Sequence, residues 1–190
     1  MFNDLSSPIR FLETRRSCRP RDMVPPGPSE DELQRMLRIA ARVPDHGKVA
    51  PWRFLIVPQD RRDALAELLN EAYLAEKPEA GRLEIQSNEQ FARQAPTLVV
   101  VIYRPDRERT IPLEEQRDSA ANAAMQLTNA AAASGYVSGW ITGWAAYSDA
   151  VRERLCDKGE EIVGFVFMGT AGAELEERPR PELGDVVRRF

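Results

Sequence analysis

Histidine is nearly absent from this chain of 190 residues, in which His46 is the only one. A site that needs two histidines is therefore excluded, including the zinc-protease helix motif and the two-histidine iron triad. A serine or cysteine nucleophile with a histidine base would have to use His46, and no Gly-x-Ser-x-Gly elbow is present. We expect no metal site, and we expect a cofactor to carry any difficult chemistry.

Cysteine, long apolar runs and an excess of positive charge are also lacking. Cys18 and Cys156 are the only cysteines; they have no metal-type spacing and suit a reducing compartment. No basic and then apolar leader follows Met1, and the longest apolar run, Thr97–Tyr103, is far too short to cross a bilayer. The formal net charge of -4 argues against sequence-independent binding to nucleic acid. We expect a cytoplasmic protein with no membrane or nucleic-acid partner.

The composition that is present is typical of a soluble globular protein, with 43% hydrophobic and 29% charged residues. A chain of this length can bury a substantial core. It contains no internal repeat, no low-complexity segment and no linker. The sequence therefore predicts a single domain over residues 1–190.

Local patterns predict helices and strands in a mixed order. Ser7-Pro8 is a helix cap, and Ser29 with Glu32 forms a capping box. The expected helices are 8 to about 16, 30 to about 41, a third through 65–72, 112 to about 134 and about 148–157, and the expected strands are 52–57, 97–103, 136–142 and 162–170. Residues 76–90 are polar and irregular, so we expect a mobile lid or surface excursion there.

This order of elements disfavours a Rossmann domain, because the regular alternation of a doubly wound sheet is missing. The glycines at 135, 139 and 143 have the wrong spacing for the dinucleotide fingerprint, and the first of them follows a helix. The middle of the 112–134 helix is rich in alanine. Such a surface allows close approach of another helix or of a flat ligand, and the helix propensity of alanine explains it equally well.

Three polar segments have the residue types of an anion site. In Arg15-Arg16-Ser17 two guanidinium forks and a hydroxyl suit a dianionic phosphate, although the arginines would also complement the dipole at a helix C-terminus. The segment Arg42–Val57 joins a loop that holds His46 to an apolar strand. Arg178-Pro-Arg180-Pro is a basic pair, and the nearby Glu174, Glu176 and Glu177 could pair with it as a charged tail.

In this order, the segments Arg15–Ser17, Arg42–Val57, Gly135–Thr142 and Arg178–Pro181 resemble the FMN-dependent nitroreductase family. The resemblance is closer to its short bacterial NAD(P)H nitroreductase subgroup and spans nearly the whole chain. It implies an α+β fold, a nitroreductase-like three-layer sandwich with a central, mostly antiparallel sheet flanked by helices. It also implies noncovalent FMN, NADH or NADPH as the electron donor, and a homodimer with its FMN sites at the interface.

The resemblance assigns a phosphate-binding role to both basic segments. Arg15, Arg16 and Ser17 match the family motif that grips the phosphate and ribityl chain of FMN. Arg178 and Arg180 resemble the basic pair near the C-terminus of the family that completes the phosphate cradle.

Other residues are implied to lie near the flavin ring. Arg42 and His46 match the loop that reaches the flavin from the partner subunit, and Lys48 is a further positive charge for its N1–O2 edge. We assign His46 no obligatory proton transfer. The stretch whose backbone lies beside the ring aligns with Trp140, Ile141 and Thr142. The subgroup commonly has a basic residue where this chain has Ile141, so the implied contact there is through the backbone.

The activity implied by the resemblance is transfer of hydride from NAD(P)H through flavin N5 to a nitroaromatic, quinone or related acceptor, by a ping-pong mechanism at one pocket. Two alternatives stay open at the level of sequence. One is a member of the superfamily with another reaction, oxygen-using or reductive dehalogenation. The other is a flavin-binding protein without catalytic turnover.

Overall fold

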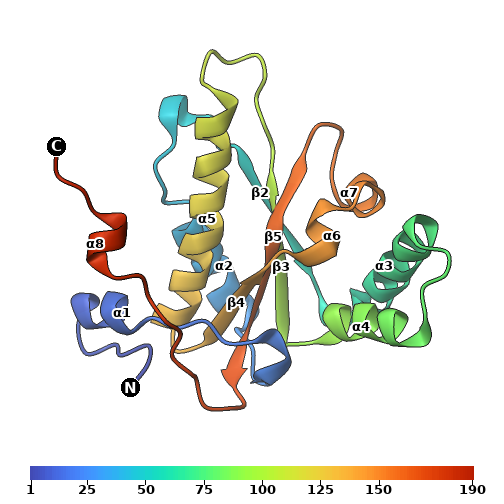
Figure 1. Ribbon diagram of the computed structural model, residues 1–190, viewed down its shortest axis with the longest axis horizontal. Helices are drawn as coiled ribbons and strands as arrows, with labels where there is room; N and C mark the ends of the chain where they lie inside the picture. Colours follow the sequence, from blue (N-terminus) through green and yellow to red (C-terminus); the bar gives the residue numbers. More distant parts are fainter.

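A five-stranded sheet lies between two sets of helices in the computed structural model, which describes residues 1–190 (Figure 1). The central strand β5 (Glu161–Ala171) pairs with β3 (Thr97–Tyr103) on one side and β4 (Val137–Ile141) on the other. β2 (Trp52–Val57) extends the sheet beyond β3, and β1 (Met23–Val24) pairs with the end of β5. All of these pairings are antiparallel, which confirms the expected sheet.

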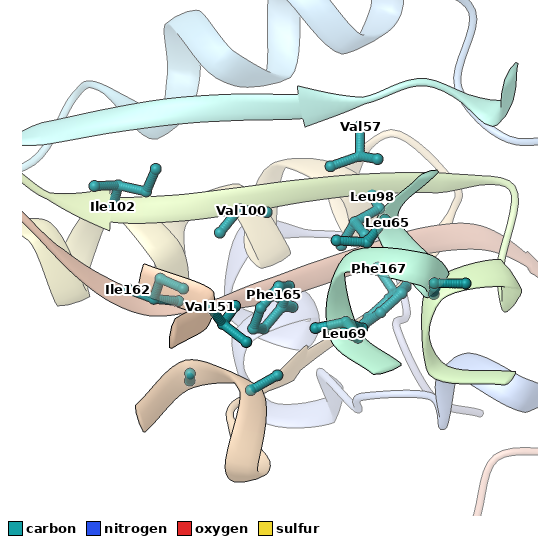
Figure 2. Close-up of a cluster of buried hydrophobic side chains, with 14 of the residues drawn as sticks. Val57, Leu65, Leu69, Leu98, Val100, Ile102, Val151, Ile162, Phe165 and Phe167 are labelled. Atoms are coloured by element: carbon teal, nitrogen blue, oxygen red, sulfur yellow. The ribbon is translucent and has the colours of Figure 1, made fainter. Parts of the chain in front are cut away.

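Helices cover both faces of the sheet because its middle strands are apolar on both sides. In β3, Leu98, Val100 and Ile102 join one buried cluster, and the alternating Val99 and Val101 join another. The first cluster packs under α3 (Arg62–Glu76), α4 (Arg82–Arg93), α6 (Gly143–Tyr147) and α7 (Asp149–Leu155), and Figure 2 shows its central side chains. The second cluster packs under α2 (Glu30–Ala40) and α5 (Leu113–Ala133). The three-layer α+β sandwich is thus confirmed.

The alanines of α5 serve packing between layers. Ala120, Ala124 and Ala131 are fully buried in the cluster that α5 shares with α2 and the sheet. Small side chains let these backbones approach closely, so helix and sheet packing accounts for the alanine-rich stretch. The capping box of α2 also forms as expected, since Ser29 Oγ accepts the Glu32 N–H at 3.4 Å and the Glu32 carboxylate accepts the Ser29 N–H at 2.8 Å.

The prediction of an irregular excursion over residues 76–90 is wrong. α3 continues to Glu76, and α4 begins at Arg82. The Glu84 carboxylate accepts the N–H of Gly81 at 2.8 Å and the hydroxyl of Tyr73 at 2.8 Å, and it pairs with Lys77. The bonds from Lys77, Gly81 and Tyr73 lower the pKa of Glu84 to about 2. Helix α4 is therefore anchored by contacts with α3, which local polarity does not indicate.

The other predicted helices and strands are present with small shifts at their ends. α1 covers Pro8–Thr14, the strand expected over 136–142 covers Val137–Ile141, and α6 was not predicted. Short 3₁₀ turns, η1 (Pro20–Asp22), η2 (His46–Lys48) and η3 (Gln59–Arg61), and a last helix α8 (Leu183–Val186) complete the chain. None of the helices combines the length and the apolar character needed to span a bilayer.

An ion pair between Glu160 and Arg53 connects the turn before β5 to β2. The Glu160 side chain is 3% exposed and pairs with Arg53, and it accepts the Asp157 N–H at 2.9 Å. Burial alone would raise the pKa of Glu160, but the bonds from Arg53 and Asp157 outweigh it and leave that pKa below its ordinary value. The charged carboxylate therefore stabilises the folded chain.

Candidate functional site

The segment Arg15–Ser17 leaves helix α1 and runs in an extended conformation. α1 ends at Thr14, and Arg15 has φ -57° and ψ 127°, so neither arginine lies in the last helical turn. The helix thus ends before the expected position near Arg16, with Arg15 as its C-cap residue. Asn3 fixes the backbone of this segment, because its Oδ1 accepts the Arg16 N–H at 2.8 Å and its Nδ2 donates to the Arg16 carbonyl at 3.4 Å.

This segment continues along the outer edge of β4. The Cys18 N–H donates to the Ser138 carbonyl at 2.9 Å. A Cβ atom at Gly139 would lie 2.5 Å from the Cys18 carbonyl oxygen, so glycine is needed for this approach. Backbone groups of alternate residues in a strand point to the same edge, which directs the Trp140 N–H and C=O to the edge where Cys18 binds. The part of this edge formed by Trp140 therefore lies next to the point where the chain leaves the Arg15–Ser17 segment.

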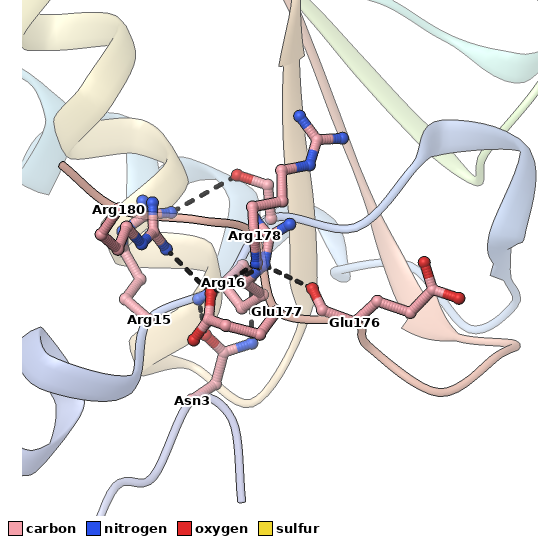
Figure 3. A network of polar contacts seen from close by, with 8 residues as sticks. Asn3, Arg15, Arg16, Glu176, Glu177, Arg178 and Arg180 are labelled. Carbon is pink, nitrogen blue, oxygen red and sulfur yellow. Dashed lines mark hydrogen bonds and ion pairs between the residues drawn. The ribbon is translucent and has the colours of Figure 1, made fainter.

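Three guanidinium groups converge beside this segment (Figure 3). Arg16 has a side chain only 8% exposed, and its Nε donates to the Glu176 carbonyl at 2.6 Å. Arg15 donates to Ser17 Oγ at 3.5 Å. Burial, and then the charges of Arg180 and Arg16, lower the pKa of Arg15. The like charges therefore act on Arg15 across the cluster, and an anion placed among them would be stabilised.

A pocket of about 250 Å³ opens next to the arginine cluster. Its lining consists of Arg16, Ser17, Cys18, Arg19, Asp22 and residues 173–178. Arg178 belongs to this wall, but its guanidinium points away from Arg15 and Arg180 (Figure 3). The structure thus brings Arg15, Arg16, Ser17 and Arg180 close together, and of these Arg16 and Ser17 line the pocket, with Arg178 also on its wall. Guanidinium and hydroxyl donors in this arrangement fit a phosphate group.

The stretch that the sequence predicts beside the flavin ring is residues 140–142, at the end of β4. The Trp140 indole donates to the Val163 carbonyl at 3.2 Å, and a Cβ atom at Gly164 would overlap this ring. Ile141 packs against the core cluster on the opposite face of the sheet. Thr142 follows the strand, at the N-cap of α6, and makes no capping bond. The side chains of Trp140 and Ile141 therefore serve the core, and a contact of these two residues with a ligand through the backbone stays a prediction.

Arg42 and His46 do not meet the arginine cluster within one chain. Both are exposed, and His46 Nδ1 lies 2.7 Å from Glu115 Oε2 in the first turn of α5. The neighbouring Lys48 is exposed as well. Figure 1 shows η2 (cyan) at this end of α5, and β4 begins beyond the other end. A helix of 21 residues is about 30 Å long, so α5 separates the two groups.

Sequence reasoning missed two contributors to this site and identified a third in part. Asn3 and Gly139 carry no local signal in the sequence. The role of Asn3 depends on its contact with Arg16, and the role of Gly139 depends on the close approach of Cys18. The expected pairing of the tail is present, since Arg180 Nη2 lies 3.4 Å from Glu177 Oε1. The contact of Glu177 with Arg16, at 3.6 Å, was not anticipated.

Fold and site together define an α+β sandwich protein with a polar, arginine-containing pocket between its N-terminal and C-terminal segments. Comparison with known proteins then gives its family. The model of the nitroreductase family matches residues 12–170, and this chain belongs to that family.

Curated relatives cover most of the chain. It is 30% identical over 163 residues to the protein named "Putative NAD(P)H nitroreductase YdjA" of Escherichia coli, which corresponds to 85% of this chain and 87% of the relative. It is 31% identical over 172 residues to a "Putative NAD(P)H nitroreductase" of Haemophilus influenzae, covering 90% and 91% of the two chains.

Solved structures share the fold. A nitroreductase-like family protein from Bacillus cereus matches with a TM-score of 0.83 and 22% identity, over 97% of this chain and 96% of the other. The FMN-dependent nitroreductase NfnB from Mycobacterium smegmatis, solved with NADPH, matches with a TM-score of 0.72 and 20% identity, over 96% and 97%. A nitroreductase with bound FMN from Bacteroides fragilis matches with a TM-score of 0.67 and 21% identity, over 90% and 92%.

Proposed function

We propose that this chain is an FMN-dependent oxidoreductase that transfers hydride from NAD(P)H to a nitroaromatic, quinone or related acceptor. The observation that carries the proposal is the convergence of Arg15, Arg16 and Arg180 with Ser17 beside one pocket, whose lining includes Arg16 and Ser17. Membership in the nitroreductase family, and relatives named as NAD(P)H nitroreductases, support the same activity. The FMN and NADPH in the names of structural neighbours support the choice of cofactors.

The residues at the pocket fit the phosphate and ribityl chain of FMN. Arg15, Arg16 and Arg180 supply guanidinium donors, Ser17 supplies a hydroxyl, and Arg178 adds a positive charge on the wall. Burial of Arg16 excludes water from one side of the phosphate, which strengthens a charge-assisted hydrogen bond.

The backbone along the outer edge of β4 then receives the flavin ring. Trp140 offers its N–H and C=O groups at this edge, Ile141 and Thr142 continue the chain beside it, and none of the three contributes a charge. Bound FMN supplies the hydride chemistry at N5, so this chain provides binding, orientation and electrostatics. We propose that residues 1–190 form a single FMN-binding domain.

The second half of the site comes from a partner subunit in a homodimer. Arg42 and His46 lie at the far end of α5 from the arginine cluster, and both are exposed. In a two-fold dimer the loop of each subunit reaches the flavin of the other, and the exchange is reciprocal. Lys48 in the same loop offers a positive charge for the N1–O2 edge.

Exposed apolar side chains support this assembly. Helix α1 buries none of its residues, and Ile9 and Leu12 are 62% and 64% exposed. In α8, Leu183 and Val186 are 75% and 62% exposed. Apolar surface of this extent on two neighbouring terminal segments marks an interaction surface, and a second copy of the chain would cover it.

The absorbance spectrum of the purified protein is the first test. We expect a yellow protein with FMN bound noncovalently, one per subunit. Steady-state oxidation of NADH and NADPH with a quinone or nitroaromatic acceptor then separates the alternatives, because a flavin-binding protein without turnover would show the spectrum and no oxidation. Donor and acceptor use one pocket in turn, so double-reciprocal plots should give parallel lines. Intersecting lines would show that both bind together and would contradict the single pocket.

A further inference from the structure

One carboxylate already lies where a phosphate is expected to bind. Glu177 Oε1 is 3.6 Å from Arg16 Nε and 3.4 Å from Arg180 Nη2 (Figure 3). It therefore bridges two of the three guanidiniums of the cluster, one from each end of the chain. A carboxylate and a phosphate offer guanidinium the same kind of anionic oxygen acceptors.

The Glu177 carboxylate is held in this position by few contacts. Its Oε1 also accepts the Arg178 N–H at 2.8 Å, and the side chain is 60% exposed. The segment from residue 173 to 181 has no regular secondary structure, and no backbone–backbone hydrogen bond connects it to the rest of the chain. The main anchor of this segment is the bond from Arg16 to the Glu176 carbonyl, which does not use the Glu177 side chain. The carboxylate can therefore swing towards water while the tail stays in place.

We propose that Glu177 is an internal competitor for the phosphate of the ligand. In the ligand-free chain its carboxylate neutralises Arg16 and Arg180, and an entering phosphate displaces it into solvent. The two anions do not share the arginine pair, because like charges a few ångströms apart repel each other. Glu177 thus sets the affinity of the pocket for phosphorylated ligands. This inference rests on the proposed binding of FMN through its phosphate.

Glu177 competes only with the phosphate group, so its effect should differ between FMN and riboflavin. FMN carries the phosphate, and riboflavin has the same ring and ribityl chain without it. Riboflavin leaves the bridge between Glu177 and the arginines intact. Removal of the carboxylate charge should therefore change the affinity for FMN and leave that for riboflavin unchanged. A Glu177 that stays in place and orients the arginines would have the opposite effect on FMN.

The test is a Glu177→Gln variant of the full chain, stripped of flavin and titrated with FMN and with riboflavin by flavin fluorescence. We expect FMN to bind the Glu177→Gln variant about tenfold more tightly than it binds the parent protein. The reason is that the substitution removes one solvent-exposed negative charge next to the phosphate. Riboflavin affinity should stay within about twofold, since no charged contact changes. Glu182→Gln is the matched control, because this exposed glutamate lies in the same tail and forms no ion pair.

Unchanged or weaker binding of FMN by the Glu177→Gln variant, with a parent protein that binds FMN, would overturn the inference and leave the proposed function standing. A parent protein that does not bind FMN would contradict the proposed function. In that case inorganic phosphate is the probe: at constant ionic strength it should raise the melting temperature of Glu177→Gln more than that of the parent. Equal shifts in the melting temperatures of the two proteins would overturn the inference that Glu177 competes with phosphate.

Discussion

Replacement of Arg15 by alanine tests the phosphate site most directly. Arg15 forms no ion pair, and its one side-chain hydrogen bond is the 3.5 Å contact with Ser17 Oγ. Its pKa is lowered by burial and by the charges of Arg180 and Arg16, so in the ligand-free chain it is a cation among cations. Arg15→Ala removes this repulsion, and the melting temperature of the ligand-free protein should not fall.

The affinity for FMN should change in the opposite direction. A hydrogen bond to a charged group contributes about 1.5–3 kcal/mol, so the loss of the Arg15 guanidinium should raise the Kd of FMN by about 10- to 150-fold. Arg15→Lys keeps the charge without the forked donors and should fall between the parent and the alanine variant. Loss of affinity without loss of stability would identify a residue that acts on the ligand.

Fluorescence titration of flavin-free protein with FMN measures the affinity, and thermal unfolding without ligand measures the stability. Arg21→Ala is the matched control, since Arg21 is an exposed arginine in η1 without an ion pair. It should bind FMN as the parent does. An Arg15→Ala protein that binds FMN within about twofold of the parent would refute the assignment, because a direct phosphate contact is worth far more than that.

Further predictions concern assembly and stability. A mixture of Arg15→Ala with an Arg42→Ala/His46→Ala double variant should regain activity that neither has alone, at about a quarter of the parent level, because each heterodimer contains one intact site; an active monomer by light scattering would contradict the shared site. Ser29→Ala should lower the free energy of unfolding in urea by about 1 kcal/mol through loss of the capping box. Glu160→Gln should lower it at pH 7 by about 1.5–3 kcal/mol, because the charge-assisted bonds are lost while the Arg53 side chain keeps some contact with water. The pKa of Glu160 is depressed in the folded chain, so the advantage of the parent should persist above the ordinary value of 4.5 and shrink as the pH falls below it, in thermal melts of both proteins.

The elements that local sequence predicted are those whose causes are local. Ser29 and Glu32 cap α2 because they are three residues apart, and the residues of β3 form a continuous apolar run because both faces of that strand are buried. Helix α4 was missed because its polar sequence is held in part by the bond between Glu84 and Tyr73, which belongs to α3. A pattern within 76–90 does not reveal a bond whose other partner lies outside it.

For the site, local sequence indicated the chemistry, and the packing of the fold set the geometry. A single histidine, two basic segments and the ordered motifs indicated a phosphate-bearing cofactor. Only the fold placed Arg180 beside Arg15, put Glu177 between Arg180 and Arg16, and left His46 at the other end of α5. Arg16 and Glu177 are far apart along the chain and meet because β4 and the C-terminal tail both return to the N-terminal segment. The physical reason is that charges interact through space, and their separation in space is set by the packing of the sheet and helices between them.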